Sequence, residues 1–193
     1  ADEELRIDKA YRNVVKAYLE SNHRKKIEII ERAYRFAKHA HAGVRRRSGE
    51  PYILHPIAVA QIVISELGLG STSICAAMLH DVVEDTEYTR EDIEANFGPK
   101  VASIVEGLTK ISGGIFGNKA SLQAENFRKL LLSMSTDVRV VLIKMADRLH
   151  NMRTLGSLRP EKQYKIAGET LYVYAPLAHR LGLFKIKQEL EDL

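Results

Sequence analysis

Residues 71–86, STSICAAMLHDVVEDT, decide the fold and the chemistry of this chain. An apolar helical run leads into His80 and Asp81, and Glu84 and Asp85 follow about one helical turn later. A buried carboxylate is costly unless a charge partner or a metal ion compensates it. On one continuous helix these four side chains would share a stripe. The pattern therefore predicts two metal ligands beside two carboxylates that handle a water molecule, although a satisfied polar pair in the core would also explain His80 and Asp81.

The composition is that of an ordinary soluble globular domain. The 193 residues are 45% hydrophobic and 28% charged, and the net charge is only +4. No apolar run approaches the roughly 20 residues that cross a bilayer, and Cys75 is the only cysteine, so no disulfide forms within the chain. We therefore expect a cytoplasmic protein without a membrane segment. The modest charge and the lack of a recognition motif argue against direct nucleic-acid binding.

Around this stretch the chain reads as one helix after another. Apolar residues recur at helical spacing, Thr89 is placed as an N-cap, and strands do not alternate with helices. A basic loop over residues 43–52 and a glycine-rich turn over residues 112–118 interrupt the pattern. These features predict an all-α helical bundle. The expected helices cover residues 3–21, 24–41, 56–67, 71–86, 90–96, 100–110, 121–134, 137–153, 160–181 and 184–193.

Two further residues are candidate metal ligands. His55 precedes Pro56 where the basic loop meets a helix, and alone it would be a local hydrogen-bonding residue. Asp147 lies in a strongly apolar helix, and alone it would pair with Lys144 or Arg148. A mixed set of imidazoles and carboxylates suits Mn, Fe, Zn or Mg-like divalent ions with positions open for water. The combined candidate set is His55, His80, Asp81 and Asp147.

Candidate substrate contacts lie near these ligands in the sequence. Asn151 and Thr154 follow Asp147 at i+4 and i+7 on the same helix face, where they would donate hydrogen bonds to a phosphate or simply face solvent. The run of arginines at residues 45–47 is ordinary solvated charge when considered alone. Beside a metal site it becomes a clamp for an anionic substrate, because guanidinium groups bind phosphate in a bidentate way.

Longer blocks of sequence resemble one known family. The blocks are RRRSGEPYILHP at 45–56, AAMLHDVVEDT at 76–86, FGPKVASIVEGLTKI at 97–111, QAENFRKLLLSM at 123–134, IKMADRLHNMRTL at 143–155 and ETLYVYAPLAHRLG at 169–182. They are similar to the hydrolase domain of the RelA/SpoT alarmone enzymes, which belong to the HD metal-dependent phosphohydrolases. The similarity runs from about residue 20 to the end of the chain.

The resemblance implies an HD-type helical bundle that removes the 3′-pyrophosphate of ppGpp or pppGpp, giving GDP or GTP and pyrophosphate, and so degrades the alarmone of the stringent response. It also implies one Mn2+ ion. Glu84 and Asp85 would position and deprotonate the attacking water. The ligands of the ion would be His55, His80, Asp81 and Asp147, and the substrate contacts would be Arg46, Arg47, Ser48, Asn151 and Thr154.

Two features qualify the resemblance. Family members commonly have Gln where Val44 stands and Lys where Arg47 stands, and Arg in place of Lys keeps the charge but changes its geometry. The chain also carries no synthetase motifs. We therefore expect residues 1–193 to be a single hydrolase domain at the N-terminal end of a longer bifunctional chain, with the synthetase domain of that chain as its partner.

Other functions fit parts of the pattern. A different HD phosphohydrolase would act on dNTPs or cyclic nucleotides, and by the same resemblance two-metal members recruit further histidines. Residues 82–146 contain none, which favours one metal. A nucleotide-sensing module would bind its ligand without turnover, and the intact Glu84 and Asp85 pair argues against it.

Overall fold

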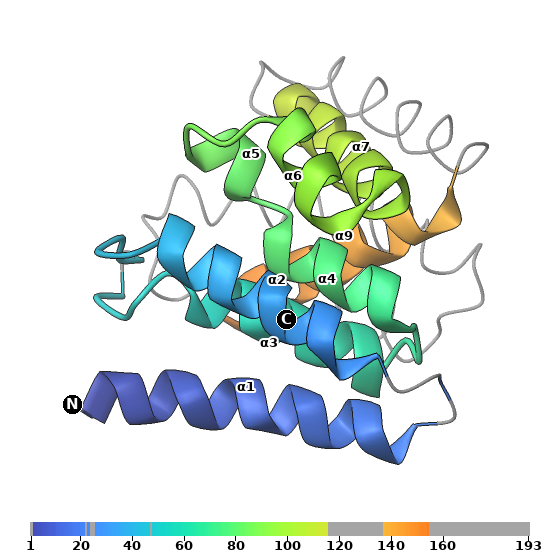
Figure 1. Ribbon diagram of the computed structural model, residues 1–193. Helices are drawn as coiled ribbons and strands as arrows, with labels where there is room; N and C mark the ends of the chain where they lie inside the picture. Colours follow the sequence, from blue (N-terminus) through green and yellow to red (C-terminus); the bar gives the residue numbers. More distant parts are fainter. Residues whose placement is uncertain (1, 22, 24–25, 47, 116–136, 155–193) are drawn as a thin grey trace. The chain divides into compact units, whose positions relative to one another are not determined.

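The computed structural model describes residues 2–21, 23, 26–46, 48–115 and 137–154 (Figure 1). The chain divides into two compact units, Ala1–Thr109 and Lys110–Leu193, and we describe each by itself. Within the described ranges the regular elements are all helices, and the only β-type pairing is an isolated bridge between Arg45 and Pro51. The prediction of an all-α fold is confirmed. The helices expected over residues 121–134, 160–181 and 184–193 lie outside the described residues.

Four helices build the first part of unit 1: α1 (Asp2–Glu20), α2 (Ile27–Ala40), α3 (Leu54–Ser65) and α4 (Ser71–Leu79). Helix α4 packs against α2 and α3, and α1 lies along α3, as Figure 1 shows in blue to green. Helices α3 and α4 are apolar on all sides, which is typical of helices enclosed by others. The two helices therefore form the centre of this unit. In α4 every residue from position 73 to position 79 is buried.

Three helices complete the described part of the chain up to residue 115. They are α5 (Val82–Asp85), α6 (Arg90–Phe97) and α7 (Pro99–Ile115). Thr89 caps α6 as predicted, because its side chain accepts from the backbone of Asp92 while the Asp92 carboxylate accepts from the backbone N–H of Thr89. The turn expected over residues 112–118 is wrong for 112–115, which continue α7.

The helix expected over residues 71–86 is not continuous. Helix α4 ends at Leu79, the backbone turns at His80 and Asp81, and α5 begins at Val82. The turn separates the ends of the expected stripe: His80 is buried whereas Glu84 is exposed. A backbone hydrogen bond of 2.8 Å from the N–H of Asp85 to the carbonyl of Asp81 keeps Asp81 and Asp85 one turn apart. The predicted stripe of four side chains on one helix is therefore wrong for His80 and Glu84.

The loop between α2 and α3 folds back on itself and delivers the chain to α3. The N–H of Arg46 donates to the carbonyl of Glu50, and the N–H of Tyr52 donates to the carbonyl of Val44, both at 2.9 Å. These bonds form a short hairpin-like turn over residues 44–52. Its tip carries Arg46 and Ser48, which the sequence predicts as substrate contacts.

Helix α1 holds this loop by charge. Ion pairs join its first two turns to the loop and to the end of α2, and both guanidinium nitrogens of Arg45 contact the carboxylate of Glu3. Arg45 is thus used within the fold rather than as part of a free basic run. The ion pairs are Arg45 with Glu3 at 2.7 Å, Lys38 with Glu4 at 2.7 Å and Arg6 with Glu50 at 2.9 Å.

Unit 2 is described through α9 (Val138–Arg153), which Asp137 caps by accepting from the N–H of Arg139 at 2.9 Å. Most of α9 is buried, including the charged residues Lys144, Asp147 and Arg148. Among all the described helices, none combines the length and the apolar character needed to cross a membrane.

Candidate metal centre

The candidate site lies where α4 ends. His80 follows the buried run of α4 and is itself only 4% exposed. Its Nδ1 lies 2.6 Å from the carbonyl oxygen of Ala77. Because a carbonyl only accepts hydrogen bonds, Nδ1 carries a proton, and Nε2 is the ring nitrogen that could bind a metal ion. Histidines that bind metals are usually held in a fixed tautomer by such a second contact.

Nε2 of His80 faces an acid. Nε2 lies 3.0 Å from Oδ2 of Asp81, whose side chain is also largely buried. A ring lone pair and a carboxylate oxygen at this distance repel each other unless a proton or a cation lies with them. The last carbonyls of α4 carry partial negative charge, which further favours a cation at this helix end. The two side chains therefore fit a divalent cation.

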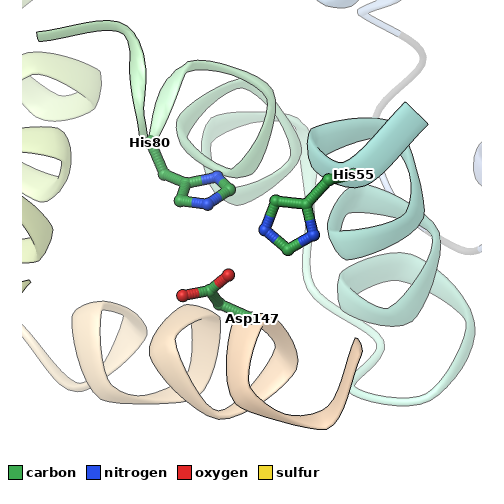
Figure 2. A group of neighbouring side chains, drawn as sticks. All are labelled: His55, His80 and Asp147. Atoms are coloured by element: carbon green, nitrogen blue, oxygen red, sulfur yellow. The ribbon is translucent and has the colours of Figure 1, made fainter. Parts of the chain in front are cut away.

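A second imidazole stands beside the first. His55 lies in the first turn of α3 and is 3% exposed, and Pro56 fits that turn because its missing N–H needs no partner there. The ring centroids of His55 and His80 are 5.4 Å apart, and each ring offers a nitrogen within 4.8 Å of the other's. Figure 2 shows the two rings turned toward one another from α3 and the end of α4.

Two residues near these ligands were not predicted as part of the site. The hydroxyl of Tyr52 donates to Oδ2 of Asp81, and the Tyr52 ring packs between the rings of His41 and His55, with centroid distances of 4.8 and 5.8 Å. His41 is 3% exposed, and burial lowers its pKa while the charge of Asp81 opposes that shift. The sequence signal that could have pointed to Tyr52 is its spacing, because it precedes the candidate ligand His55 by three residues.

Glu84 and Asp85 lie on α5, just beyond the buried pair. Both residues are exposed to solvent, so water reaches them. Neighbouring atoms nevertheless crowd the Asp85 carboxylate, and this burial raises its pKa; the charge of Asp81 adds to the effect. The imidazole of His80 and a hydrogen bond from the Tyr52 hydroxyl act in the opposite direction.

The predicted substrate contacts in unit 1 lie on the loop before α3. Arg46 is half-buried, and Ser48 is exposed with its hydroxyl 3.3 Å from a carboxylate oxygen of Glu50. Arg47 lies outside the described residues. The loop therefore presents one described guanidinium and one described hydroxyl, both anchored to a turn that is fixed by backbone hydrogen bonds.

The remaining predicted residues lie on α9 in unit 2. Asp147 is 7% exposed, and its Oδ2 lies 3.1 Å from the ammonium nitrogen of Lys144. The ion pair considered for Asp147 is therefore present. Asn151 is half-buried one turn further on, and Thr154 ends the helix with its hydroxyl donating to the carbonyl of His150 at 3.0 Å. A threonine hydroxyl has one proton, so Thr154 would have to leave this bond to donate to a phosphate.

The donor types suit a divalent metal. Figure 2 draws three buried side chains that each offer one ligand atom, a ring nitrogen from His55 and His80 and a carboxylate oxygen from Asp147. Mixed nitrogen and oxygen ligands that leave positions open for water are typical of catalytic rather than structural ions. The chemistry available to such residues is metal-assisted hydrolysis.

Comparison with known proteins places the chain in a family. Residues 33–184 match the family model described as the HD domain, so the chain belongs to the HD-domain family. A solved structure described as a metazoan ortholog of SpoT that hydrolyzes ppGpp has a TM-score of 0.69, is 26% identical, and covers 90% of this chain and 100% of its own. The predicted HD fold is confirmed.

Curated relatives are more similar in sequence. A guanosine-3′,5′-bis(diphosphate) 3′-pyrophosphohydrolase of Vibrio cholerae is 54% identical over 167 residues, which are 86% of this chain and 24% of the relative. The Haemophilus influenzae protein of the same name is 58% identical over 157 residues, 81% of this chain and 23% of the relative. The bifunctional (p)ppGpp synthase/hydrolase SpoT of Escherichia coli K12 is 54% identical over 86% of this chain. The resemblance to the RelA/SpoT enzymes is confirmed, and the chain spans about a quarter of the length of these relatives.

Proposed function

We propose that this chain hydrolyses the 3′-pyrophosphate of ppGpp and pppGpp and thereby degrades the alarmone of the stringent response. The observation that carries the proposal is the buried contact between Nε2 of His80 and Oδ2 of Asp81 at the end of α4, two donor types that a divalent cation binds. The names of the relatives, several of them 3′-pyrophosphohydrolases, support the substrate.

The proposed ligand set holds one Mn2+ ion. Three members are buried and offer nitrogen or oxygen atoms, and Asp81 faces the ring of His80 directly. The lack of any histidine in residues 82–146 favours one ion over two. When bound, such an ion acidifies a water molecule and neutralises charge on a phosphate oxygen. The proposed ligands are His55, His80, Asp81 and Asp147.

The carboxylates on α5 act on the water. Glu84 and Asp85 lie within a few residues of the ligands and remain accessible, so either can orient the water and accept its proton. The water oxygen bonds to the phosphorus attached to the ribose 3′ oxygen, and the bond between that phosphorus and the 3′ oxygen breaks. The ribose oxygen takes up a proton. The products are GDP or GTP and pyrophosphate.

The proposed nucleotide contacts are the residues that the sequence singles out on the loop before α3 and on α9. Guanidinium groups suit the charge and shape of phosphates, and amide and hydroxyl groups suit ribose and phosphate oxygens. The proposed contacts are Arg46, Arg47, Ser48, Asn151 and Thr154.

The chain is proposed to be one hydrolase domain, residues 1–193, of a longer cytoplasmic enzyme. Its relatives are about four times as long, and one is a bifunctional synthase/hydrolase. The natural partner of this domain would then be the synthetase domain of the same chain. The proposal includes no direct contact with nucleic acid.

The test is release of pyrophosphate from ppGpp by the purified 193-residue chain with Mn2+, beside a sample treated with EDTA. We expect GDP and pyrophosphate in equal amounts only in the sample with metal. Tight ppGpp binding without product in the presence of Mn2+ would instead show a nucleotide-sensing module. Turnover of dNTPs or cyclic nucleotides in place of ppGpp would show a different HD phosphohydrolase.

A further inference from the structure

Tyr52 connects three parts of the candidate site. Its N–H donates to the carbonyl of Val44 in the hairpin-like loop, and its own carbonyl accepts from the N–H of His55, both at 2.9 Å. Its ring is packed on two sides by the imidazoles of His41 and His55. The backbone hydrogen bonds fix the main chain of Tyr52 and the imidazole contacts fix its ring. The hydroxyl at the end of the ring therefore has little freedom of position.

The hydroxyl contacts the Asp81 carboxylate of the site. It donates to Oδ2 of Asp81, the same oxygen that lies 3.0 Å from Nε2 of His80. The phenol group therefore contacts a proposed metal ligand directly. Residues that orient metal ligands in this way typically change metal affinity or activity by about 10- to 100-fold when removed.

We propose that Tyr52 is a positioning residue for the hydrolysis: its hydroxyl fixes the Asp81 carboxylate for the metal ion. The inference rests on the proposed function, because it assigns Asp81 to the metal. It assigns no proton transfer to Tyr52.

The test is Tyr52→Phe, which removes the hydroxyl and keeps the ring between His41 and His55. Titration of the metal-free 193-residue chain with Mn2+, followed by calorimetry, measures affinity without any substrate. We expect the Mn2+ dissociation constant to rise about tenfold or more. At saturating Mn2+ we expect a lower kcat with KM for ppGpp within about twofold, because the lost contact orients the metal ligand Asp81 and not the nucleotide.

Tyr34→Phe is the matched control. Tyr34 is a buried tyrosine of α2 that stacks on Tyr11 and interacts with Lys38, so it tests the loss of a phenol hydroxyl elsewhere in the same unit. Its Mn2+ affinity should equal that of the unchanged chain. Asp81→Asn should weaken Mn2+ binding at least as much as Tyr52→Phe, because Tyr52 acts through Asp81.

Unchanged Mn2+ affinity in Tyr52→Phe would overturn the inference, as would an equal loss in Tyr34→Phe or a smaller loss in Asp81→Asn. If the unchanged chain binds Mn2+ but releases no pyrophosphate, the proposed function fails while the affinity comparison still decides the role of Tyr52. If the unchanged chain binds no Mn2+, both proposals fail.

Discussion

His80 and Asp81 are neighbours in the chain, yet the protein fixes them by different means. The ring of His80 is oriented by the backbone carbonyl of Ala77, whereas the carboxylate of Asp81 is oriented by the side chain of Tyr52. A backbone contact survives most substitutions nearby, but a side-chain contact can be removed by one substitution. The position of Asp81 is therefore the more sensitive of the two to mutation.

The acids on α5 give a direct test of water activation. Replacing Glu84 with Gln and Asp85 with Asn removes two bases and keeps the shape of both side chains. We expect pyrophosphate release from ppGpp to fall by about 100-fold or more, because general bases contribute roughly that much. The Mn2+ dissociation constant measured by calorimetry should change less than about threefold if neither residue is a ligand.

The matched control for that pair is Glu87→Gln with Glu91→Gln. These exposed acids lie close by in the sequence, and their replacement removes the same amount of charge. Activity should persist in this control. Full activity in the Glu84 and Asp85 double variant would show that neither residue handles the water.

At the scale of the element, α4 is the helix on which the site depends. Its last seven residues are buried, so its packing fixes where His80 begins. Leu79→Ala should lower the free energy of unfolding by about 2–5 kcal/mol, because it leaves a cavity in a helix that is enclosed on all sides. Leu5→Ala is the control, since Leu5 is 69% exposed on α1 and should change stability little. Urea unfolding of both variants measures the difference, and equal small losses would contradict a central role for α4.

Cys75 on α4 gives a prediction about pH. Burial raises the pKa of its thiol to about 12. In the unfolded chain the pKa of this thiol is about 8.5, so the unfolded chain loses the proton at lower pH than the folded chain does. The contribution of Cys75 to the free energy of unfolding therefore falls as pH rises from about 8.5 toward 12. The measurement is urea unfolding between pH 8 and 10 for the unchanged chain and Cys75→Ala. The unchanged chain should lose more stability with rising pH, and parallel pH profiles would rule the effect out.

The elements differ in how far the sequence predicts them. The start of α6 was predictable because Thr89 and Asp92 form a local capping box, which depends on four consecutive residues. The break after Leu79 was not, because apolar periodicity continues through Val82 and does not reveal a turn at two polar residues. The ligand types were predictable from their chemistry in apolar surroundings. The role of Tyr52 depends on how the loop folds back, which no local pattern records.

At the scale of the whole molecule, metal binding should stabilise the fold. A ligand that binds only the native state at about 100 times its dissociation constant adds about 2.7 kcal/mol to the free energy of unfolding. We expect Mn2+ to raise the melting temperature of the 193-residue chain and EDTA to reverse the rise. Calorimetric melting with and without metal measures it, and an unchanged melting temperature at millimolar Mn2+ would contradict the proposed centre.

The same measurement tests Asp147, which the sequence explains equally well as an ion-pair partner. Asp147→Asn should abolish most of the stabilisation by Mn2+ if its carboxylate binds the ion. Lys144→Gln breaks the observed ion pair but keeps the carboxylate, so it should retain stabilisation by Mn2+ even if its own melting temperature is lower. Retained stabilisation in Asp147→Asn would leave Asp147 with the structural role alone.

Helix α1 has a consequence for where this domain can be cut. The family match begins at residue 33, so α1 precedes it entirely. Helix α1 nevertheless forms ion pairs with the loop that carries Arg46 and Ser48, through Glu3 and Arg6. It also forms one with the end of α2, through Glu4. The family match is thus shorter than the part of the chain whose ion pairs hold this loop. A protein trimmed to residues 33–184 would keep every proposed metal ligand. It would lose the ion pairs from α1 that hold the loop leading to Tyr52.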